Sequence, residues 1–255
     1  TMERILTFIL TLTLALSFCV NSFAAATTAT ASETQTGTSE AQTDTSKTQA
    51  RTSEAQTDTS KVQAGASYGI SNLSGAPDIV AESAVVMDAN TGTILYGKEA
   101  DTKRYPASIT KVMTALLAVE NCKMSDVITY SNAAVNGIEA GSSTAGINVG
   151  AKLTVEDSLY ALMLVSANEA AAAIAEHISG STTEFAKLMT KRAKELGCTN
   201  TQFKNPHGLP NEEHYTTAHD MGLILKEAMK HEEFRKISGT ISYTLKKSDT
   251  LKDTL

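Results

Sequence analysis

The segment Tyr105-Pro-Ala-Ser-Ile-Thr-Lys-Val-Met-Thr-Ala115 carries the clearest indication of fold and chemistry in this chain. Ser108 and Lys111 precede the apolar run Val112–Val119, which predicts a helix. Residues three positions apart lie on one helical face, so the Lys111 amine is expected beside the Ser108 hydroxyl. Serine becomes a nucleophile when a base lies within hydrogen-bond reach, and a lysine with a lowered pKa is such a base. The spacing alone fits equally well an ordinary helix start with a surface lysine.

A second polar pair, Ser166 and Asn168, interrupts a long apolar helical pattern. These side chains offer a hydroxyl and an amide where packing requires neither. Buried polar groups need partners, and Lys111 is a suitable one. The pair therefore favours a catalytic role for Ser108, although a helix–helix turn with a local cap explains the same residues.

The remaining pattern mixes short strands with longer helices. Ala84–Asp88 and Thr93–Tyr96 flank a turn and predict a hairpin. The further expected elements are a strand at Val127–Tyr130, a glycine-rich loop at Gly137–Gly150, a helix capped by Thr154 with Asp157, a helix over Ala170–Ile178, a helix capped by Thr183 and closed after Leu196 by Gly197, a rigid loop at Asn205–Pro210, a helix from Thr217 to about Lys230, and the beginning of a strand at Ile241–Leu245. Strands at both ends of a helical middle predict an α+β domain with an incomplete sheet.

The first 26 residues match a secretory leader. Ile5–Val20 is apolar and too short for a membrane span, and small residues suited to cleavage follow it. Residues 1–26 are therefore expected to be a signal peptide. The mature protein is expected to be secreted, extracellular or periplasmic.

Residues 27–76 are rich in Thr, Ser, Ala and Gln and hold almost no large apolar side chains. Within the repeat region at 38–65, Thr38–Lys47 recurs unchanged as Thr52–Lys61. A segment this polar cannot bury a core, which predicts a disordered linker. A wall-binding or glycosylated segment is the alternative. The globular domain is assigned to residues 77–255.

Charge and cysteine content narrow the classes of function. The 255-residue chain has a formal net charge of −6 and no basic patch, which argues against nucleic acid as a partner. Only Cys122 and Cys198 lie beyond the leader, which is too few for a disulfide framework. The sequence leaves open whether they pair.

Taken together, four segments from about Ala81 to Ile237 resemble the serine-type D-alanyl-D-alanine carboxypeptidases, which are low-molecular-mass penicillin-binding proteins. The segments are the hairpin Ala84–Tyr96, the nucleophile segment Tyr105–Ala115, the second motif Val165-Ser-Ala-Asn-Glu169, and the later loop of Asn205–Leu209 with His214–Thr217. The resemblance implies a β-lactamase/transpeptidase-like α+β fold. Its antiparallel sheet packs with helices and is accompanied by a helical subdomain, and the sheet is expected to be incomplete here.

The resemblance also implies a role for each site residue. Ser108 would attack the peptide bond between the two terminal D-alanines of a peptidoglycan stem peptide. Lys111 would take the Ser108 proton, and Ser166 would relay a proton to the departing D-alanine. Asn168 would hold Lys111 and bind substrate. β-Lactams would be trapped on Ser108, and neither a cofactor nor a metal is expected.

One element of the family pattern is missing from the sequence. The family has a third motif, Lys-Thr-Gly, whose lysine binds the substrate carboxylate. The nearest look-alikes, Lys246-Lys-Ser248 and Lys252-Asp-Thr254, lack its glycine. We interpret this as truncation, with further strands and a possible membrane anchor beyond residue 255. The chain as given is expected to be inactive or poorly active in D-alanine release.

Two alternatives keep the fold but change the function. A class A β-lactamase needs a glutamate on an Ω-loop, and Glu184 and Glu195 fall on an expected helix instead. A non-catalytic, cell-wall-associated penicillin-recognising protein would explain the linker and the missing third motif together.

A zinc peptidase is a third alternative. It would use His207, His214 and His219 with Asp220. No H-E-x-x-H motif is present, and Glu213 beside His214 lacks helical ligand spacing. The sequence therefore favours a metal-free site.

Overall fold

The computed structural model describes residues 79–245. The expected leader and linker lie outside these residues, as do the two look-alikes of the third motif. The elements are β1 (Ala84–Met87), β2 (Ile94–Lys98), the 3₁₀ helix η1 (Ala107–Thr110), α1 (Lys111–Asn121), β3 (Val127–Thr129), α2 (Asn132–Asn136), β4 (Lys152–Thr154), α3 (Val155–Leu164), α4 (Asn168–Ser179), α5 (Thr182–Glu195), α6 (Ala218–Ala228) and α7 (Glu232–Ser238).

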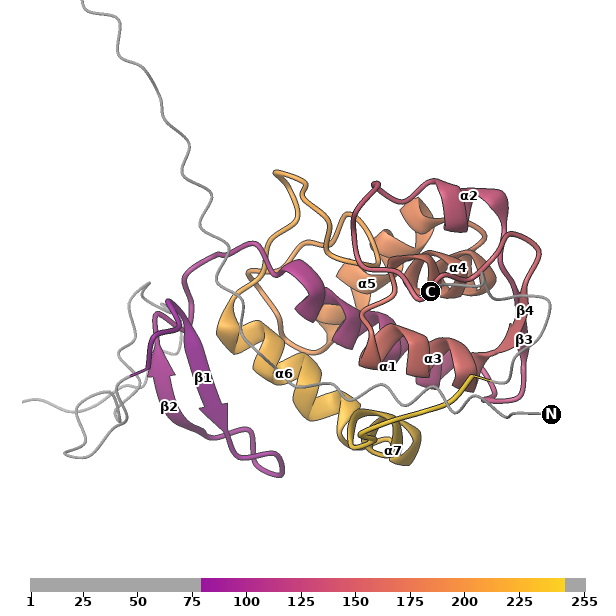
Figure 1. Ribbon diagram of the computed structural model, residues 1–255. Coiled ribbons are helices and arrows are strands. Elements are labelled where there is room, and N and C mark those ends of the chain that lie inside the picture. The colour runs from indigo at the N-terminus through magenta and orange to yellow at the C-terminus, as the bar shows by residue number, and fades with distance from the viewer. Residues whose placement is uncertain (1–78, 246–255) are drawn as a thin grey trace, which may run out of the picture. The chain divides into compact units, whose positions relative to one another are not determined.

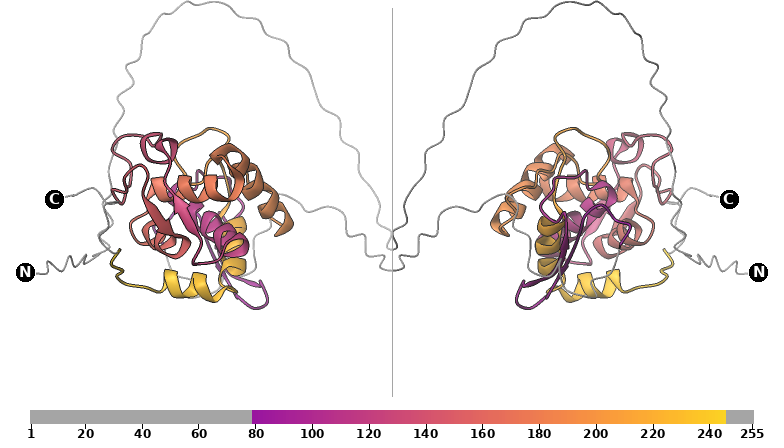
Figure 2. Two further views of the ribbon diagram at one scale, coloured as in Figure 1. Left: turned by 90° about the vertical axis from the view of Figure 1, so that its right-hand side faces the viewer. Right: turned by 90° about the vertical axis from the view of Figure 1, so that its left-hand side faces the viewer.

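The predicted hairpin is confirmed by the antiparallel pair β1–β2. Asp88 closes its turn, because one carboxylate oxygen accepts hydrogen bonds from the Thr91 backbone N–H at 2.7 Å and the Asn90 N–H at 3.1 Å. The hairpin packs on α6, as the side views show (Figure 2). Gly222 of α6 permits this approach, since a Cβ there would lie 3.1 Å from a Val85 methyl carbon.

Helix α1 is the central element of the described residues. It packs against α3, α4, α5, α6 and α7 (Figure 1). Met113, Leu116 and Leu117 are fully buried on it. Its start differs from the prediction. Ser108 lies in η1 rather than in the first α-helical turn, because Ala107 has a positive φ of 49° and a 3₁₀ turn follows it. Lys111 then begins α1.

The second small sheet pairs β3 with β4. β3 confirms the expected strand, while β4 was not predicted, since three residues next to a helix carry little pattern of their own. The predicted cap of α3 is confirmed, because Thr154 Oγ1 accepts a hydrogen bond from the Asp157 backbone N–H at 3.0 Å. This bond satisfies a backbone donor in the first turn of α3.

The later helices follow the predicted order with shifted ends. Ser181, and not Thr183, caps α5, because its hydroxyl accepts from the Glu184 backbone N–H at 3.1 Å. Thr217 caps α6 as predicted. α6 ends at Ala228 rather than near Lys230, and the unpredicted α7 follows.

The expected strand at Ile241–Leu245 is wrong, since these residues form no strand in the structure. Instead, the Tyr243 ring stacks on Tyr160 of α3 with centroids 3.7 Å apart, and its hydroxyl donates to an Asp157 carboxylate oxygen at 2.7 Å. The α+β assignment holds, with helices dominating and two small antiparallel sheets. Cys122 and Cys198 are both free thiols.

Candidate active site

Ser108 lies exposed on η1, and two other predicted site residues contact its hydroxyl oxygen. The Lys111 amine donates to Ser108 Oγ at 3.3 Å. The Ser166 hydroxyl donates to the same oxygen at 3.0 Å. The structure therefore brings together one hydroxyl and two groups that can exchange protons with it.

Lys111 is buried, with 3% of its surface exposed. Its amine also donates to Asn168 Oδ1 at 2.7 Å and to the His207 carbonyl oxygen at 2.9 Å. Burial lowers the pKa of Lys111 to about 8, against the opposing effect of the Glu169 charge. Once the amine loses a proton, its two remaining N–H bonds can serve Asn168 and His207 while its lone pair faces Ser108. This geometry suits a general base.

The second motif lies between α3 and α4. Ser166 has a positive φ of 58°, an uncommon backbone conformation for a residue other than glycine. No side chain caps α4, so the alternative of a local cap does not apply. The turn directs the Ser166 hydroxyl to Ser108 instead, and Asn168 begins α4 with its side chain buried against Lys111.

The loop Asn205–Pro210 supplies a contact that sequence reasoning missed. The Asn205 side chain accepts from the Gly208 backbone N–H at 2.6 Å and donates to the Leu209 carbonyl at 2.9 Å. These two hydrogen bonds hold the loop around His207, whose carbonyl oxygen Lys111 contacts. A backbone carbonyl leaves no mark in a sequence, so only the rigid Asn-Pro-His-Gly pattern pointed to this loop.

Gly208 also sets how closely this loop approaches the nucleophile segment. Its φ is +87°, and a Cβ there would lie 1.8 Å from the Ala107 carbonyl oxygen. Only glycine fits such an approach without a backbone shift. The loop can therefore pass directly against the residue that precedes Ser108.

The two histidines of this region are neutral scaffolding. Burial lowers the pKa of both His207 and His214 to about 4. His214 Nδ1 accepts from the Lys204 backbone N–H at 3.1 Å, which leaves Nε2 to donate to Thr110 Oγ1 at 2.9 Å. His214 thereby ties the loop to the residue before α1.

The histidines that the zinc alternative required do not gather into a ligand set. Among residues 79–245, two groups hold three possible ligand atoms within 4.8 Å of one another: Cys122 with Asp126 and His177, and Glu120 with Glu227 and His231. Neither group includes His207, His214 or His219, and neither touches Ser108.

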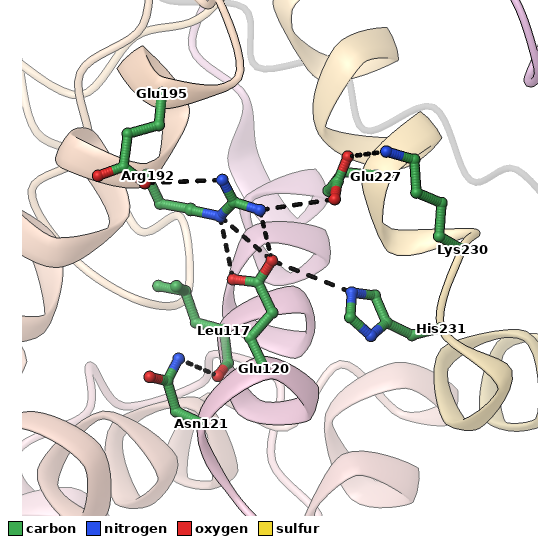
Figure 3. Close-up of polar contacts among 8 residues, drawn as sticks. All are labelled: Leu117, Glu120, Asn121, Arg192, Glu195, Glu227, Lys230 and His231. Carbon is green, nitrogen blue, oxygen red and sulfur yellow. Dashed lines mark hydrogen bonds and ion pairs between the residues drawn. The ribbon is translucent and has the colours of Figure 1, made fainter.

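The second of these groups is an ion network around Arg192 (Figure 3). The Arg192 guanidinium contacts both carboxylate oxygens of Glu120, at 2.7 and 3.1 Å, and Glu227 at 3.5 Å. The arginine already neutralises these carboxylates and joins α5 to α1 and α6. Its role is therefore structural.

A cavity of about 700 Å³ opens over the Ser108 hydroxyl. Ser108, Asn168, His207 and Tyr105 line it. Part of its wall comes from Gly141, Ser142 and Ser143, within the stretch expected only as a loop. Glu184 and Glu195 do not line this cavity, and each pairs with a lysine of α5. The β-lactamase alternative needs a glutamate on a loop at the site, so neither residue meets that requirement.

Residues 70–254 match the family described as D-alanyl-D-alanine carboxypeptidase, peptidase family S11. This chain belongs to that family. The resemblance that rested on four short segments is thus confirmed over most of the chain.

Individual members of the family are similar to this chain in sequence. The chain is 44% identical over 165 residues to the D-alanyl-D-alanine carboxypeptidase DacF of Bacillus subtilis, an alignment that covers 63% of this chain and 42% of DacF. It is 36% identical over 179 residues to the D-alanyl-D-alanine carboxypeptidase of Streptomyces sp. K15, covering 67% of this chain and 62% of the relative. The chain thus spans about two fifths of the length of DacF.

Solved structures agree on the fold. The D-alanyl-D-alanine carboxypeptidase DacD from Francisella tularensis is similar with a TM-score of 0.60 and 37% identity, covering 64% of this chain and 40% of that one. Penicillin-binding protein 6B from Escherichia coli gives a TM-score of 0.65 at 28% identity, covering 71% of this chain and 60% of that one. The transpeptidase-like α+β fold is therefore confirmed.

Proposed function

We propose that this chain is a serine D,D-carboxypeptidase that removes the terminal D-alanine from peptidoglycan stem peptides. One observation carries the proposal: Ser108 Oγ receives hydrogen bonds from both the Lys111 amine and the Ser166 hydroxyl. A hydroxyl between a base of lowered pKa and a second proton carrier suits acyl transfer, and the family supplies the substrate class.

In the first step, unprotonated Lys111 takes the Ser108 proton as Ser108 Oγ attacks the carbonyl carbon between the two D-alanines. The backbone N–H of Ser108 would supply one donor to the oxyanion. When the carbon–nitrogen bond breaks, the proton held by Lys111 reaches the leaving amine through Ser166, and Ser108 carries the acyl group.

In the second step, water hydrolyses the ester on Ser108 and regenerates the hydroxyl. Asn168 keeps Lys111 in place throughout, because its Oδ1 accepts one of the amine's hydrogens. The Asn168 side chain also lines the cavity, where it would bind the substrate's backbone amide. No step requires a metal or a cofactor.

Stem peptides ending in D-alanyl-D-alanine are the partners that this chemistry implies, and β-lactams would acylate the same serine. The substrate places the enzyme outside the bacterial cytoplasmic membrane at the cell wall. No helix within residues 79–245 combines the length and the apolar character needed to cross a bilayer.

The first experiment measures the intact mass of the chain, without residues 1–26, after incubation with benzylpenicillin. We expect a covalent adduct that disappears in Ser108→Ala. No adduct with wild type would contradict acyl transfer at Ser108. D-Alanine release from a stem-peptide mimic is measured on a full-length chain that carries the Lys-Thr-Gly motif, and labelling without release there would favour the non-catalytic penicillin-recognising protein.

A further inference from the structure

Glu169 is a buried acid immediately after the second motif. Only 2% of its surface is exposed, and it lies in the first turn of α4. An acid there favours the helix N-terminus, but an exposed side chain would serve that purpose. Burying a carboxylate is costly unless specific donors compensate. The position of Glu169 therefore calls for an explanation beyond helix stability.

The donors come from the segment that follows one wall of the cavity. Glu169 Oε1 accepts hydrogen bonds from the Thr144 hydroxyl at 2.6 Å, the Ala145 backbone N–H at 2.7 Å and the Ile147 backbone N–H at 3.5 Å. One carboxylate oxygen thus holds a run of backbone that is separated from α4 by more than twenty residues.

The same junction is tied a second time through the neighbouring residue. The Asn168 backbone N–H donates to the Ser143 carbonyl at 3.0 Å. Ser143 lines the same cavity as Ser142 and Ser108. The wall and the second motif are therefore joined by bonds from two consecutive residues of α4.

Glu169 also acts on Lys111 through its charge. Its Oε2 atom is buried and has no hydrogen-bond partner, so little in its surroundings screens that charge. The carboxylate raises the pKa of Lys111 against the larger effect of burial. The other titratable group beside the amine is His207, whose lowered pKa keeps it neutral near pH 7. Among the described residues, Glu169 is therefore the ionised side chain whose charge raises the pKa of Lys111.

We propose that Glu169 is a positioning residue that couples segment 144–147, which directly follows the cavity wall at 141–143, to the base Lys111. Its Oε1 atom holds that segment, and its negative charge favours the protonated form of the Lys111 amine. This inference rests on the proposed function for its meaning in catalysis, but its two structural parts are measurable without turnover.

Two substitutions separate the parts. Glu169→Gln keeps an acceptor oxygen for segment 144–147 and removes the charge. Glu169→Ala removes both. Glu176→Gln, on the same helix and outside the cavity lining, is the matched control. The Lys111 titration is followed by NMR with ¹³C-labelled lysine, assigned through Lys111→Arg. Segment 144–147 is followed by hydrogen exchange at the Ala145 amide, and Ser108 acylation by benzylpenicillin is measured against pH.

We expect Glu169→Gln to move the Lys111 titration and the acid limb of acylation to lower pH, with Ala145 exchange unchanged. Glu169→Ala should speed Ala145 exchange by about tenfold or more and slow acylation at every pH. The proposal is overturned if Lys111 titrates alike in wild type and Glu169→Gln, or if Ala145 exchange is unchanged in Glu169→Ala. A wild type that never acylates would contradict the proposed function, while the titration and exchange data still decide this inference.

Discussion

At the scale of single residues, the decisive quantity is the protonation of Lys111. A base of ordinary lysine pKa would be almost fully protonated near neutrality, but burial lowers the pKa of Lys111 to about 8. At pH 7 about a tenth of the molecules then carry the free amine. The buried contacts with Asn168 and the His207 carbonyl hold that amine toward Ser108.

This pKa predicts the pH dependence of acylation. In the proposed mechanism Lys111 acts in its unprotonated form, so the acylation rate constant should rise about tenfold per pH unit below pH 8 and level off above it. Lys111→Gln should lose about 10²- to 10⁴-fold in rate. Stopped-flow measurements with a chromogenic β-lactam test both, with the melting temperature as a check on folding. A rate constant independent of pH across this range would exclude Lys111 as the base.

Gly208 predicts a second effect at this scale. In Gly208→Ala the new Cβ meets the Ala107 carbonyl oxygen, so the backbone beside Ser108 has to move. We expect a loss of about 2 to 4 kcal/mol in the free energy of unfolding and slower acylation. Gly180→Ala is the matched control, since Gly180 has a similar φ of +75° but open space, and should cost about 1 kcal/mol. Equal losses from the two variants would show that the close approach is unimportant.

At the scale of elements, the sequence predicted the helices better than the segments that connect them. Thr154 and Thr217 cap their helices as expected, because a side chain that bonds the first turn is a local signal. The 3₁₀ turn at Ser108 depends on the contact of Ala107 with Gly208, which is distant in sequence. The strand expected at Ile241–Leu245 failed because a strand needs a hydrogen-bonded neighbour, and Tyr243 stacks on α3 instead.

The ion network of Arg192 makes a prediction about how elements hold together (Figure 3). Arg192→Met should cost about 1 to 3 kcal/mol of unfolding free energy, because Glu120 loses a bidentate partner while only 17% of its side chain is exposed. Lys187→Met on the same helix breaks an exposed pair with Glu184 and should cost under about 0.5 kcal/mol. Denaturant titration measures both.

A double variant tests the cause. Adding Glu120→Gln to Arg192→Met removes the unpaired charge and should recover part of the loss. If the double variant is no more stable than Arg192→Met, packing of the arginine stem accounts for the effect rather than the charge.

At the scale of the whole molecule, the site is assembled from parts far apart in the chain. Sequence reasoning proposed Ser108, Lys111, Ser166 and Asn168, because each belongs to a short motif with chemical meaning, and the structure places these four side chains in contact. It did not find the His207 carbonyl or the wall at 141–143. Backbone groups are interchangeable in sequence, and only the packing of the loops against α1 and α4 selects which of them face the site.

His214 links Lys204 to Thr110, just before α1. Because its pKa is lowered in the folded state, we expect this ring to make the fold sensitive to acid. Its folded pKa is about 4, while the unfolded chain has the ordinary value of 6.5. Between these two values the unfolded state binds a proton at this ring that the folded state does not. The free energy of unfolding therefore falls as the pH falls through this window and is unaffected by this ring above it. Since one pKa unit corresponds to about 1.4 kcal/mol, the difference between 6.5 and about 4 corresponds to a loss of about 3 kcal/mol.

The variant His214→Gln isolates this contribution, since its Nε2 amide can still reach Thr110 while no group titrates. We expect the variant to be less stable than wild type at pH 6.5. Its free energy of unfolding should fall less on going to pH 4, because only wild type has an imidazole that is protonated in the unfolded state and stays neutral in the folded state. Urea titrations at both values measure the difference, and His177→Gln, at an exposed position on α4, controls for histidine loss as such. Parallel losses in wild type and His214→Gln would show that this ring is not an acid-sensitive tie between the loop and α1, and His207 or carboxylates elsewhere in the fold would then have to account for acid unfolding.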